Sequence, residues 1–329
     1  MSSSTEAFEE PDEPQGAPGR PARPVPAPRS TTGADWHAFV RLARPRQWVK
    51  NLLVFVAPAA AGVLSHGDVF GRTVAAFGIF CLAASGTYFL NDAIDAPADR
   101  RHPVKHTRPV ASGQVPVRVA LVVGSVMVAA SVALGGWLAG AELAGVMAIY
   151  AAVNVAYSLG LRNEPIVDLA LVSAGFVLRA IAGGVATGVS LSDWFLIVAS
   201  FGSLLIVTGK RSGEQVLLAE HGSGSDGIRQ TLGLYTPSFL RAVRTFSAAV
   251  TVTAYCLWSF QRAEAIHPGH HPIWFELTII PFVIGLLHVL RLLDAGAGAA
   301  PEDLALHDHR LQVYGVAWAV LFAIGVYAR

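Results

Sequence analysis

Long apolar stretches separated by short polar segments dominate the chain from residue 49 onward. Each stretch has roughly 17 to 25 residues, enough for a helix to cross a hydrocarbon core about 30 Å thick. Backbone polar groups inside lipid must pair internally, so we expect every stretch to be helical. The pattern predicts nine membrane-spanning helices, at residues 49–66, 71–90, 117–137, 141–159, 166–187, 192–209, 243–260, 273–293 and 311–328.

The composition agrees with a polytopic membrane protein. Apolar residues make up 53% of the chain and charged residues 14%, whereas a soluble domain normally carries about 25% charged residues. Small residues such as Gly135, Gly136, Gly183 and Gly184 run through the predicted helices and permit close helix packing in lipid. We therefore predict an all-α fold that consists of one bundle of nine transmembrane helices.

Residues 1–36 differ from the rest of the chain. They are rich in proline between Pro11 and Pro28 and carry almost no large apolar side chain, so they bury too little surface to offset the entropy of ordering. They also lack the apolar core of a secretory signal. We predict a disordered cytosolic tail, followed by a single transmembrane domain over residues 37–329.

The basic residues indicate the orientation of the bundle. Cytosolic segments of membrane proteins carry an excess of Lys and Arg. A cytosolic N-terminus places all but four of the 24 basic residues on the cytosolic side, the exceptions being Arg72, Arg179, Arg262 and Arg329. The two longest predicted loops, 91–116 and 210–242, fall on that same side. The sequence therefore predicts a plasma-membrane protein whose active site faces the cytosol.

The strongest chemical signal follows the second predicted helix. Asn91, Asp95 and Asp99 are spaced by four residues, which on a helix leaves them in one stripe. Oxygen ligands suit Mg²⁺, which binds a few carboxylates together with waters and substrate phosphates. Pro97 interrupts the stripe, so we expect the helix to kink or end there. A solvated loop is the alternative, but acidic residues at this depth are costly unless they are used.

Basic residues follow the stripe at once, among them Arg100, Lys105 and Arg108. Cations beside carboxylates are expected where a metal–diphosphate complex is held and the charge of its leaving group is neutralised. The segment therefore predicts a diphosphate substrate.

A second group joins the fourth and fifth predicted helices and contains Tyr157, Arg162 and Asp168. Asp168 begins the next helix and could complete the metal or substrate site from across the bundle. Its alternative role is that of a capping acid after Pro165.

Two further polar groups lie where predicted helices begin or end. Arg46 and Trp48 are explained by a positively charged anchor with an interfacial aromatic ring. Lys50 and Asn51 stand where apolar residues begin and favour a polar cavity. Lys210 ends the sixth predicted helix, either as a phosphate-binding cation or as a topology anchor.

Arg179 lies inside the fifth predicted helix. An intramembrane charge indicates a buried partner or a cavity, and pairing with an acid or contact with a substrate both remain open. His288 has no ligand pattern around it and is predicted to be structural. The two cysteines lie in apolar stretches as packed hydrophobes, and a net charge of +1 provides no field that would recruit nucleic acid.

These motifs resemble the signatures of the UbiA superfamily of intramembrane prenyltransferases, over about residues 38–329. Within it they are most similar to actinobacterial phosphoribosyltransferases that act on polyprenyl phosphate. The segments that carry the resemblance are the Asn91–Asp99 stripe, Arg44-Pro-Arg-Gln-Trp-Val-Lys50-Asn51, His102-Pro-x-Lys105-x-x-Arg108-Pro109, Tyr157-Ser-Leu, Pro165-Ile-Val-Asp168 and Phe176-x-Leu-Arg-Ala-Ile-Ala-Gly-Gly184.

The resemblance implies a nine-helix bundle with a lateral opening to lipid and a Mg²⁺-dependent transferase. The donor would be 5-phosphoribosyl 1-diphosphate and the acceptor a polyprenyl phosphate such as decaprenyl phosphate. The product would serve the synthesis of cell-wall arabinan precursors. A homo-oligomer remains an open possibility.

The resemblance also implies residue roles. Asn91, Asp95 and Asp99 correspond to the Mg²⁺–diphosphate ligands, and Asp168 to the acid of the second motif, which makes Asp95, Asp99 and Asp168 the expected catalytic residues. Arg162 stands where a lysine is expected, and guanidinium is not interchangeable with ammonium. The residues expected to bind substrate are Arg46, Lys50, Asn51, Arg100, Lys105, Arg108, Tyr157, Arg162 and Lys210.

Two other functions compete with this interpretation. A prenyltransferase would use the same metal site to move a polyprenyl group from its diphosphate to an aromatic or quinone precursor. A secondary transporter would also contain intramembrane acids, but transporter sites usually lie near the midplane on broken helices. Here the acids cluster at one face, which disfavours transport.

Overall fold

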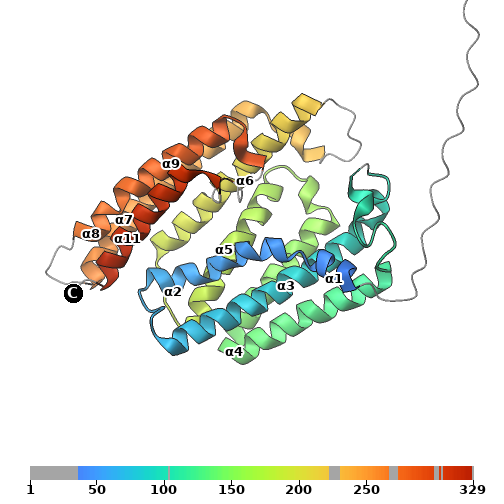
Figure 1. Ribbon diagram of the computed structural model, residues 1–329, viewed down its shortest axis with the longest axis horizontal. Helices are drawn as coiled ribbons and strands as arrows, with labels where there is room; N and C mark the ends of the chain where they lie inside the picture. Colours follow the sequence, from blue (N-terminus) through green and yellow to red (C-terminus); the bar gives the residue numbers. More distant parts are fainter. Residues whose placement is uncertain are drawn as a thin grey trace, which may run out of the picture.

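The described part of the chain folds into helices joined by turns and contains no β-strand, which confirms the all-α prediction (Figure 1). The predicted tail lies outside this part except for Trp36, as does the centre of the predicted loop 210–242. The computed structural model describes residues 36–102, 104–221, 230–266, 273–299, 304 and 307–327.

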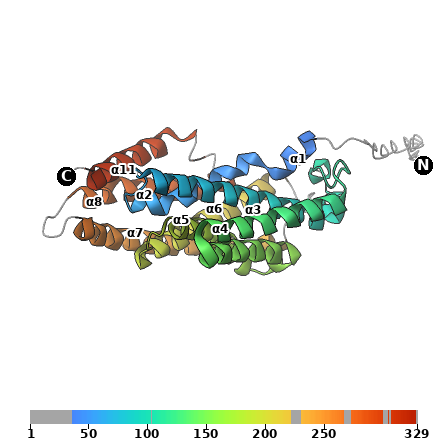
Figure 2. The same ribbon diagram turned by 90° about the horizontal axis from the view of Figure 1, so that it is seen from below.

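The helices form two groups that meet along the middle of the molecule. Figure 1 shows α3 and α4 together on one side and α7, α9 and α11 on the other, with α5 and α6 between them; in Figure 2, seen from below, α7, α8 and α11 lie at one end of the molecule and α1 lies toward the other. The α-helices are α1 (Trp36–Ala43), α2 (Val56–Ala60), α3 (Gly67–Asp99), α4 (Val117–Leu159), α5 (Val167–Thr187), α6 (Asp193–His221), α7 (Pro237–Ile266), α8 (Ile273–Leu277), α9 (Ile279–Asp294) and α11 (His309–Tyr327). The 3-10 helices are η1 (Pro45–Phe55), η2 (Lys105–Thr107), η3 (Leu161–Asn163), η4 (Gln230–Leu234) and η5 (Ala297–Ala299).

A sharp reversal divides α4 into two helices. Ala139 and Gly140 leave the helical conformation, and Gly140 has a φ of 70°, which glycine adopts without strain. A Cβ on Gly135 would lie 3.2 Å from Cγ of Met147, although twelve residues of continuous helix rise about 18 Å. The two arms therefore pack side by side and correspond to the predicted helices 117–137 and 141–159.

In the part of the chain that the structure describes, six helices are long and apolar enough to cross a membrane, judged by length and composition. The predicted first span instead forms η1 and α2, and the predicted span 243–260 lies within α7; neither meets this criterion. The reversal in α4 explains why two predicted spans form one long element. The qualifying helices are Gly67–Asp99, Val117–Leu159, Val167–Thr187, Asp193–Leu217, Ile273–Asp294 and His309–Tyr327.

Close backbone packing brings η1 against α5. A Cβ on Gly183 would lie 1.9 Å from the carbonyl oxygen of Val54, so a larger residue has no room there. A core cluster that includes Phe80, Met147 and Leu178 fills the space where α3, α4 and α5 meet. The polar residues at the start of η1 are thereby held next to α5.

Two helices extend further than their apolar stretches. α3 continues through Pro97, which removes one backbone hydrogen bond from its last turn, and ends two residues later at Asp99. α6 continues to His221, so Lys210 lies on a helix and not at the start of a loop. The predicted boundary of the loop at residue 210 was wrong.

Candidate active site

A polar cavity of about 370 Å³ lies at the C-terminal end of α3, where α3, α4, α5 and η1 meet. It brings together many of the residues predicted from separate motifs: Lys50, Asn91, Asp95, Arg108, Tyr157, Arg162 and Lys210. Other polar side chains, which the sequence interpretation did not assign to a site, also line it: Arg44, Gln47, Tyr88, Asp92, Tyr150, Asn154, Ser158 and Arg179.

Several predicted substrate-binding residues do not line this cavity. Arg46 and Arg100 are exposed, and Lys105 is half-buried in η2. Asn51 is fully buried beside the cavity and contacts one of its lining residues, Arg179. Direct contact between these four residues and a substrate remains a prediction.

Three carboxylates of α3 are paired with arginines from three different segments. The pairs are Arg44 Nη2 with Asp92 Oδ1 at 2.6 Å, Arg162 Nη1 with Asp95 Oδ1 at 2.8 Å and Arg108 Nη1 with Asp99 Oδ2 at 2.8 Å. Arg108 also reaches Asp92 at 3.3 Å, so one guanidinium joins two carboxylates. Before any ligand binds, the protein itself therefore balances the negative charge of these three carboxylates.

The oxygen atoms on the cavity wall fit a hard divalent cation. Asp95 Oδ1 is buried and accepts no hydrogen bond, although Arg162 lies within ion-pair distance of it. Asn91 Oδ1 accepts a hydrogen bond from the hydroxyl of Ser158 at 2.5 Å, and Asp92 lines the same cavity. Mg²⁺ commonly takes one or two carboxylates and completes its shell with waters and phosphate oxygens. Among the described residues, no three His, Cys, Asp or Glu side chains are grouped to hold a metal.

Asp99 occupies a different position from the other two residues of the stripe. It is 4% exposed, bonds Arg108 and does not line the cavity. In this arrangement Asp99 orients a cation that does line the cavity, and its role as a metal ligand remains a prediction.

Asp168 is fully buried at the start of α5, and both of its oxygens are engaged. Arg211 Nε donates to Oδ2 at 3.0 Å, and the hydroxyl of Tyr235 donates to Oδ1. Burial and this hydrogen bond raise the pKa of Tyr235 to about 12, so it stays protonated as a donor. The same hydroxyl accepts the N–H of Ile166 at 2.7 Å. This geometry supports a structural role that ties α5 to α6 and to the segment before α7.

We expect Asp168→Asn to destabilise the fold by about 3 kcal/mol, because it removes the fully buried one of the two carboxylates that pair with the Arg211 guanidinium, the other being Glu214. Chemical unfolding of the purified protein measures this change in the free energy of unfolding. The control is Glu164→Gln, an exposed acid on the same connection, which should change stability by less than about 0.5 kcal/mol. Normal stability combined with a raised Mg²⁺ requirement would instead identify Asp168 as a metal ligand.

Arg179 is a buried cation on the cavity wall, 6% exposed. Its Nε donates to Asn51 Oδ1 at 2.7 Å, its Nη2 to the hydroxyl of Tyr150 at 3.0 Å and its Nη1 to the carbonyl of Gly175. Its guanidinium also lies 5.3 Å from the ring centre of Phe80. The described residues offer it hydrogen-bond acceptors and aromatic faces but no carboxylate. Of the two alternatives left open by the sequence, contact with a substrate is therefore the one supported.

Signals for the unassigned lining residues were present in the sequence. Asn154 is a polar residue inside an apolar stretch, and its amide donates to the carbonyl of Tyr150 at 2.8 Å. Asp92 directly follows Asn91 but lies outside the four-residue spacing. Arg44 begins one of the segments that carry the family resemblance, and only the fold shows that it reaches Asp92.

The sequence model described as the UbiA prenyltransferase family matches residues 52–307. The chain belongs to this family. The resemblance that the motifs indicated is thereby confirmed.

Curated relatives match this UbiA-family chain over most of their length. A decaprenyl-phosphate phosphoribosyltransferase of Mycolicibacterium smegmatis is 43% identical over 296 residues, which cover 88% of this chain and 92% of the relative. An enzyme of the same name from Mycobacterium tuberculosis is 44% identical over 283 residues, which cover 85% of this chain and 91% of that relative.

A solved structure supports the fold independently. A UbiA homolog from Archaeoglobus fulgidus, bound to DMAPP and Mg²⁺, superposes with a TM-score of 0.61 at 17% identity, covering 88% of this chain and 98% of the homolog. This similarity establishes the UbiA fold of the chain.

Proposed function

We propose that this UbiA-family protein transfers the 5-phosphoribosyl group from 5-phosphoribosyl 1-diphosphate to a polyprenyl phosphate of the decaprenyl type, with release of diphosphate. The observation that carries the proposal is the identity of 43% to 44%, across nearly the whole of both chains, with enzymes named decaprenyl-phosphate phosphoribosyltransferase. A product of this kind would serve cell-wall arabinan synthesis.

The charges of the cavity support a substrate that carries several phosphates. Asp92 and Asp95, with Asn91, would hold Mg²⁺, which supplies Lewis-acid stabilisation of the departing diphosphate when bound. Arg179 and Lys210 line the same cavity, and neither has a carboxylate partner among the described residues. These cations would therefore meet phosphate groups on the α5 and α6 side.

The reaction requires charge stabilisation more than proton transfer. Departure of diphosphate from C1 of the ribose develops an oxocarbenium-like centre. The attacking lipid phosphate is already an anion near neutral pH, so we assign no general base. The residues of the cavity would position the two substrates and neutralise the developing charge, and direct displacement would invert the anomeric centre.

An apolar groove beside the cavity supports a lipid acceptor. It has a volume of about 340 Å³, lies between η1, α5 and α6, and is lined mainly by apolar side chains such as Leu53, Ala180 and Val198. Phe176 lines both the groove and the polar cavity. An isoprenoid chain in the groove would place its phosphate at the boundary between the two spaces.

We also propose the finer membrane topology that the sequence predicts. Nine spans with a cytosolic N-terminus would place the cavity at the cytosolic face of the plasma membrane, where a soluble donor can reach it. The asymmetry of the basic residues supports this orientation.

Supplying the purified protein with each donor tests the function. We expect labelled 5-phosphoribosyl 1-diphosphate plus decaprenyl phosphate to give a labelled lipid, and EDTA to abolish the reaction until Mg²⁺ is restored. The matched arm supplies a labelled polyprenyl diphosphate with an aromatic acid. A labelled product from that arm alone would establish the prenyltransferase alternative, and full activity in EDTA would remove the metal from the proposal.

A further inference from the structure

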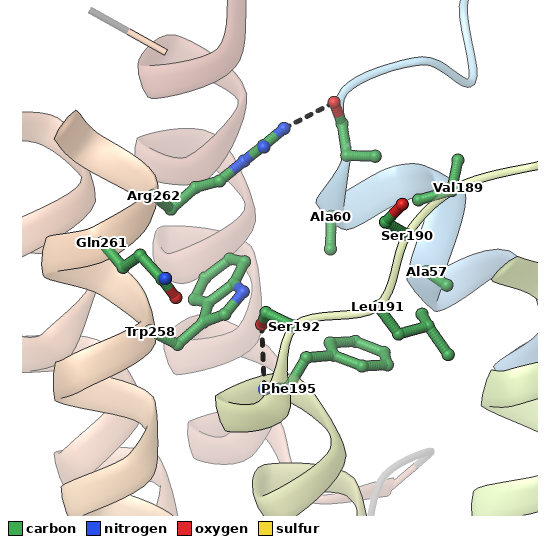
Figure 3. A pocket seen from close by; sticks show the side chains of 11 residues that line it. Ala57, Ala60, Val189, Ser190, Leu191, Ser192, Phe195, Trp258, Gln261 and Arg262 are labelled. Atoms are coloured by element: carbon green, nitrogen blue, oxygen red, sulfur yellow. Dashed lines mark hydrogen bonds between the residues drawn. The ribbon is translucent and has the colours of Figure 1, made fainter. Parts of the chain in front are cut away.

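A second pocket lies at the end of the bundle far from the carboxylates (Figure 3). It has a volume of about 200 Å³ and is formed by α2, the connection between α5 and α6, the start of α6 and the last turns of α7. α2 precedes the first residue of α3, whereas Asp92 lies near its last. The intervening turns of α3 extend about 35 Å, so this pocket is separate from the candidate active site.

Arg262 supplies the charge of this second pocket. Its Nη2 donates to the carbonyl oxygen of Ala61 at 2.6 Å, while its Nε is buried and has no hydrogen-bond partner. Within the described chain, no carboxylate lies within ion-pair distance of its guanidinium. A buried donor without a partner costs about 1–3 kcal/mol. The described protein therefore leaves the charge of Arg262 without a carboxylate to balance it, which favours an anionic ligand in the pocket.

Arg72, near the same end of the bundle, shows how an arginine is satisfied by protein alone. Its Nε donates to the carbonyl of Ala186 at 2.7 Å and its Nη2 to the carbonyl of Leu138 at 3.1 Å. Both acceptors lie at or near helix ends, where carbonyl groups lack intrahelical partners. Arg262 makes one such bond, from Nη2, and its Nε–H has no acceptor among the described residues.

The other walls of the pocket combine polar and apolar groups. Ser190 and Gln261 supply polar side chains, and the Ser192 hydroxyl accepts the N–H of Phe195 at 3.2 Å, which leaves its own hydrogen to donate. Leu191 and Trp258 form the apolar wall, and Figure 3 shows Trp258 and Arg262 extending from one helix, with Arg262 directed toward the end of α2. A phosphate attached to an apolar body would contact both kinds of wall.

We propose that this pocket binds the phosphate group of an anionic bilayer phospholipid, with Arg262 as the cation that meets it. Guanidinium presents parallel N–H donors that match phosphate oxygens. Free inorganic phosphate shares that chemistry, but it would leave the apolar wall unused. The pocket also joins the end of α2 to α7, because the Arg262–Ala61 bond links these two helices. A bound lipid would therefore strengthen the contact between them.

Thermal unfolding of the purified full-length protein in an uncharged detergent tests this site. We expect added phosphatidylglycerol to raise the unfolding midpoint by several degrees, since a ligand that binds only the folded state stabilises it. Arg262→Gln should lower the affinity for phosphatidylglycerol at least tenfold, measured by native mass spectrometry. Arg72→Gln is the matched control. Its unfolding midpoint in detergent alone should fall, but phosphatidylglycerol should raise that midpoint by as much as in the unaltered protein.

Three outcomes would overturn the proposal. One is an equal lipid-induced shift in Arg262→Gln and the unaltered protein. The second is an equal shift with inorganic phosphate at the same concentration, which would exclude a lipid source. Arg262→Lys keeps the charge but loses the planar donor pair, and should bind lipid with intermediate affinity; affinity equal to that of the unaltered protein is the third. The readouts are stability and lipid binding, so the result does not depend on the proposed transferase activity.

Discussion

Asp95→Asn is expected to lower the rate of phosphoribosyl transfer by about 100- to 1,000-fold with little change in stability. Asp95 lines the cavity and presents a buried oxygen that no hydrogen bond satisfies. Removal of its negative charge weakens the attraction for a divalent cation and removes the ion pair with Arg162. Steady-state transfer of labelled donor at increasing Mg²⁺ measures both effects, and half-maximal activity should require more metal.

The control for Asp95 lies on the same helix. Asp68 is in the first turn of α3, at the opposite end from the cavity, so Asp68→Asn makes the same chemical change away from the site. It should leave the transfer rate and the Mg²⁺ requirement unaltered. An Asp95→Asn variant with an unchanged Mg²⁺ requirement would show that this carboxylate serves its ion pair and not a metal.

Arg179→Gln is expected to lower kcat/KM by about 100-fold while the protein becomes no less stable. A charge-assisted hydrogen bond to a phosphate contributes up to about 3 kcal/mol, which corresponds to that factor. Burial of a cation without a carboxylate is itself costly, so a neutral side chain should maintain or raise the unfolding midpoint. Separate KM values for donor and acceptor identify which substrate phosphate Arg179 contacts.

The two readouts distinguish substrate binding from a structural role. If Arg179 served only to hold Asn51 and Tyr150 in place, Arg179→Gln would lower the unfolding midpoint and leave both KM values unchanged. Arg179→Lys keeps a positive charge but loses the planar set of donors. It should recover part of the activity, and full recovery would show that charge alone is required.

The length of the apolar stretches predicted most of the helices, because the thickness of the bilayer fixes the length of a spanning segment. The length of the apolar stretches could not locate the end of α6, because Lys210, Arg211 and Glu214 have the polar character of a loop. In the fold, Arg211 bonds Glu214 one turn along the helix and Asp168 on α5. These contacts allow the helix to continue beyond its apolar part.

The spacing of the acidic stripe identified the position of the site but not the role of each carboxylate. At 100° per residue, Asp95 lies about 40° around the helix from Asn91, Asp99 about 80° and Asp92 about 100°. Asp92 and Asp99 therefore face a similar direction, and both contact Arg108. Helical geometry gives these angles, whereas the course of the loop that carries Arg108 depends on tertiary packing.

The same limit applies to Asp168. Its place after Pro165 at the start of a helix suited both a ligand and a capping acid, and neither role involves Tyr235. The contact between them joins positions 67 residues apart, and no local pattern encodes such a distance. These contacts support a structural role that sequence spacing could not indicate, and the catalytic role of Asp168 remains a prediction.

The ion pair between Arg162 and Asp95 has a consequence for the order of ligand binding. A divalent cation that takes the carboxylate would release the guanidinium for an incoming phosphate, and a phosphate that takes the guanidinium would likewise release the carboxylate. The affinities for the two ligands are then thermodynamically linked, and each raises the other by the same factor. Such heterotropic cooperativity would favour capture of the donor as a preformed magnesium complex.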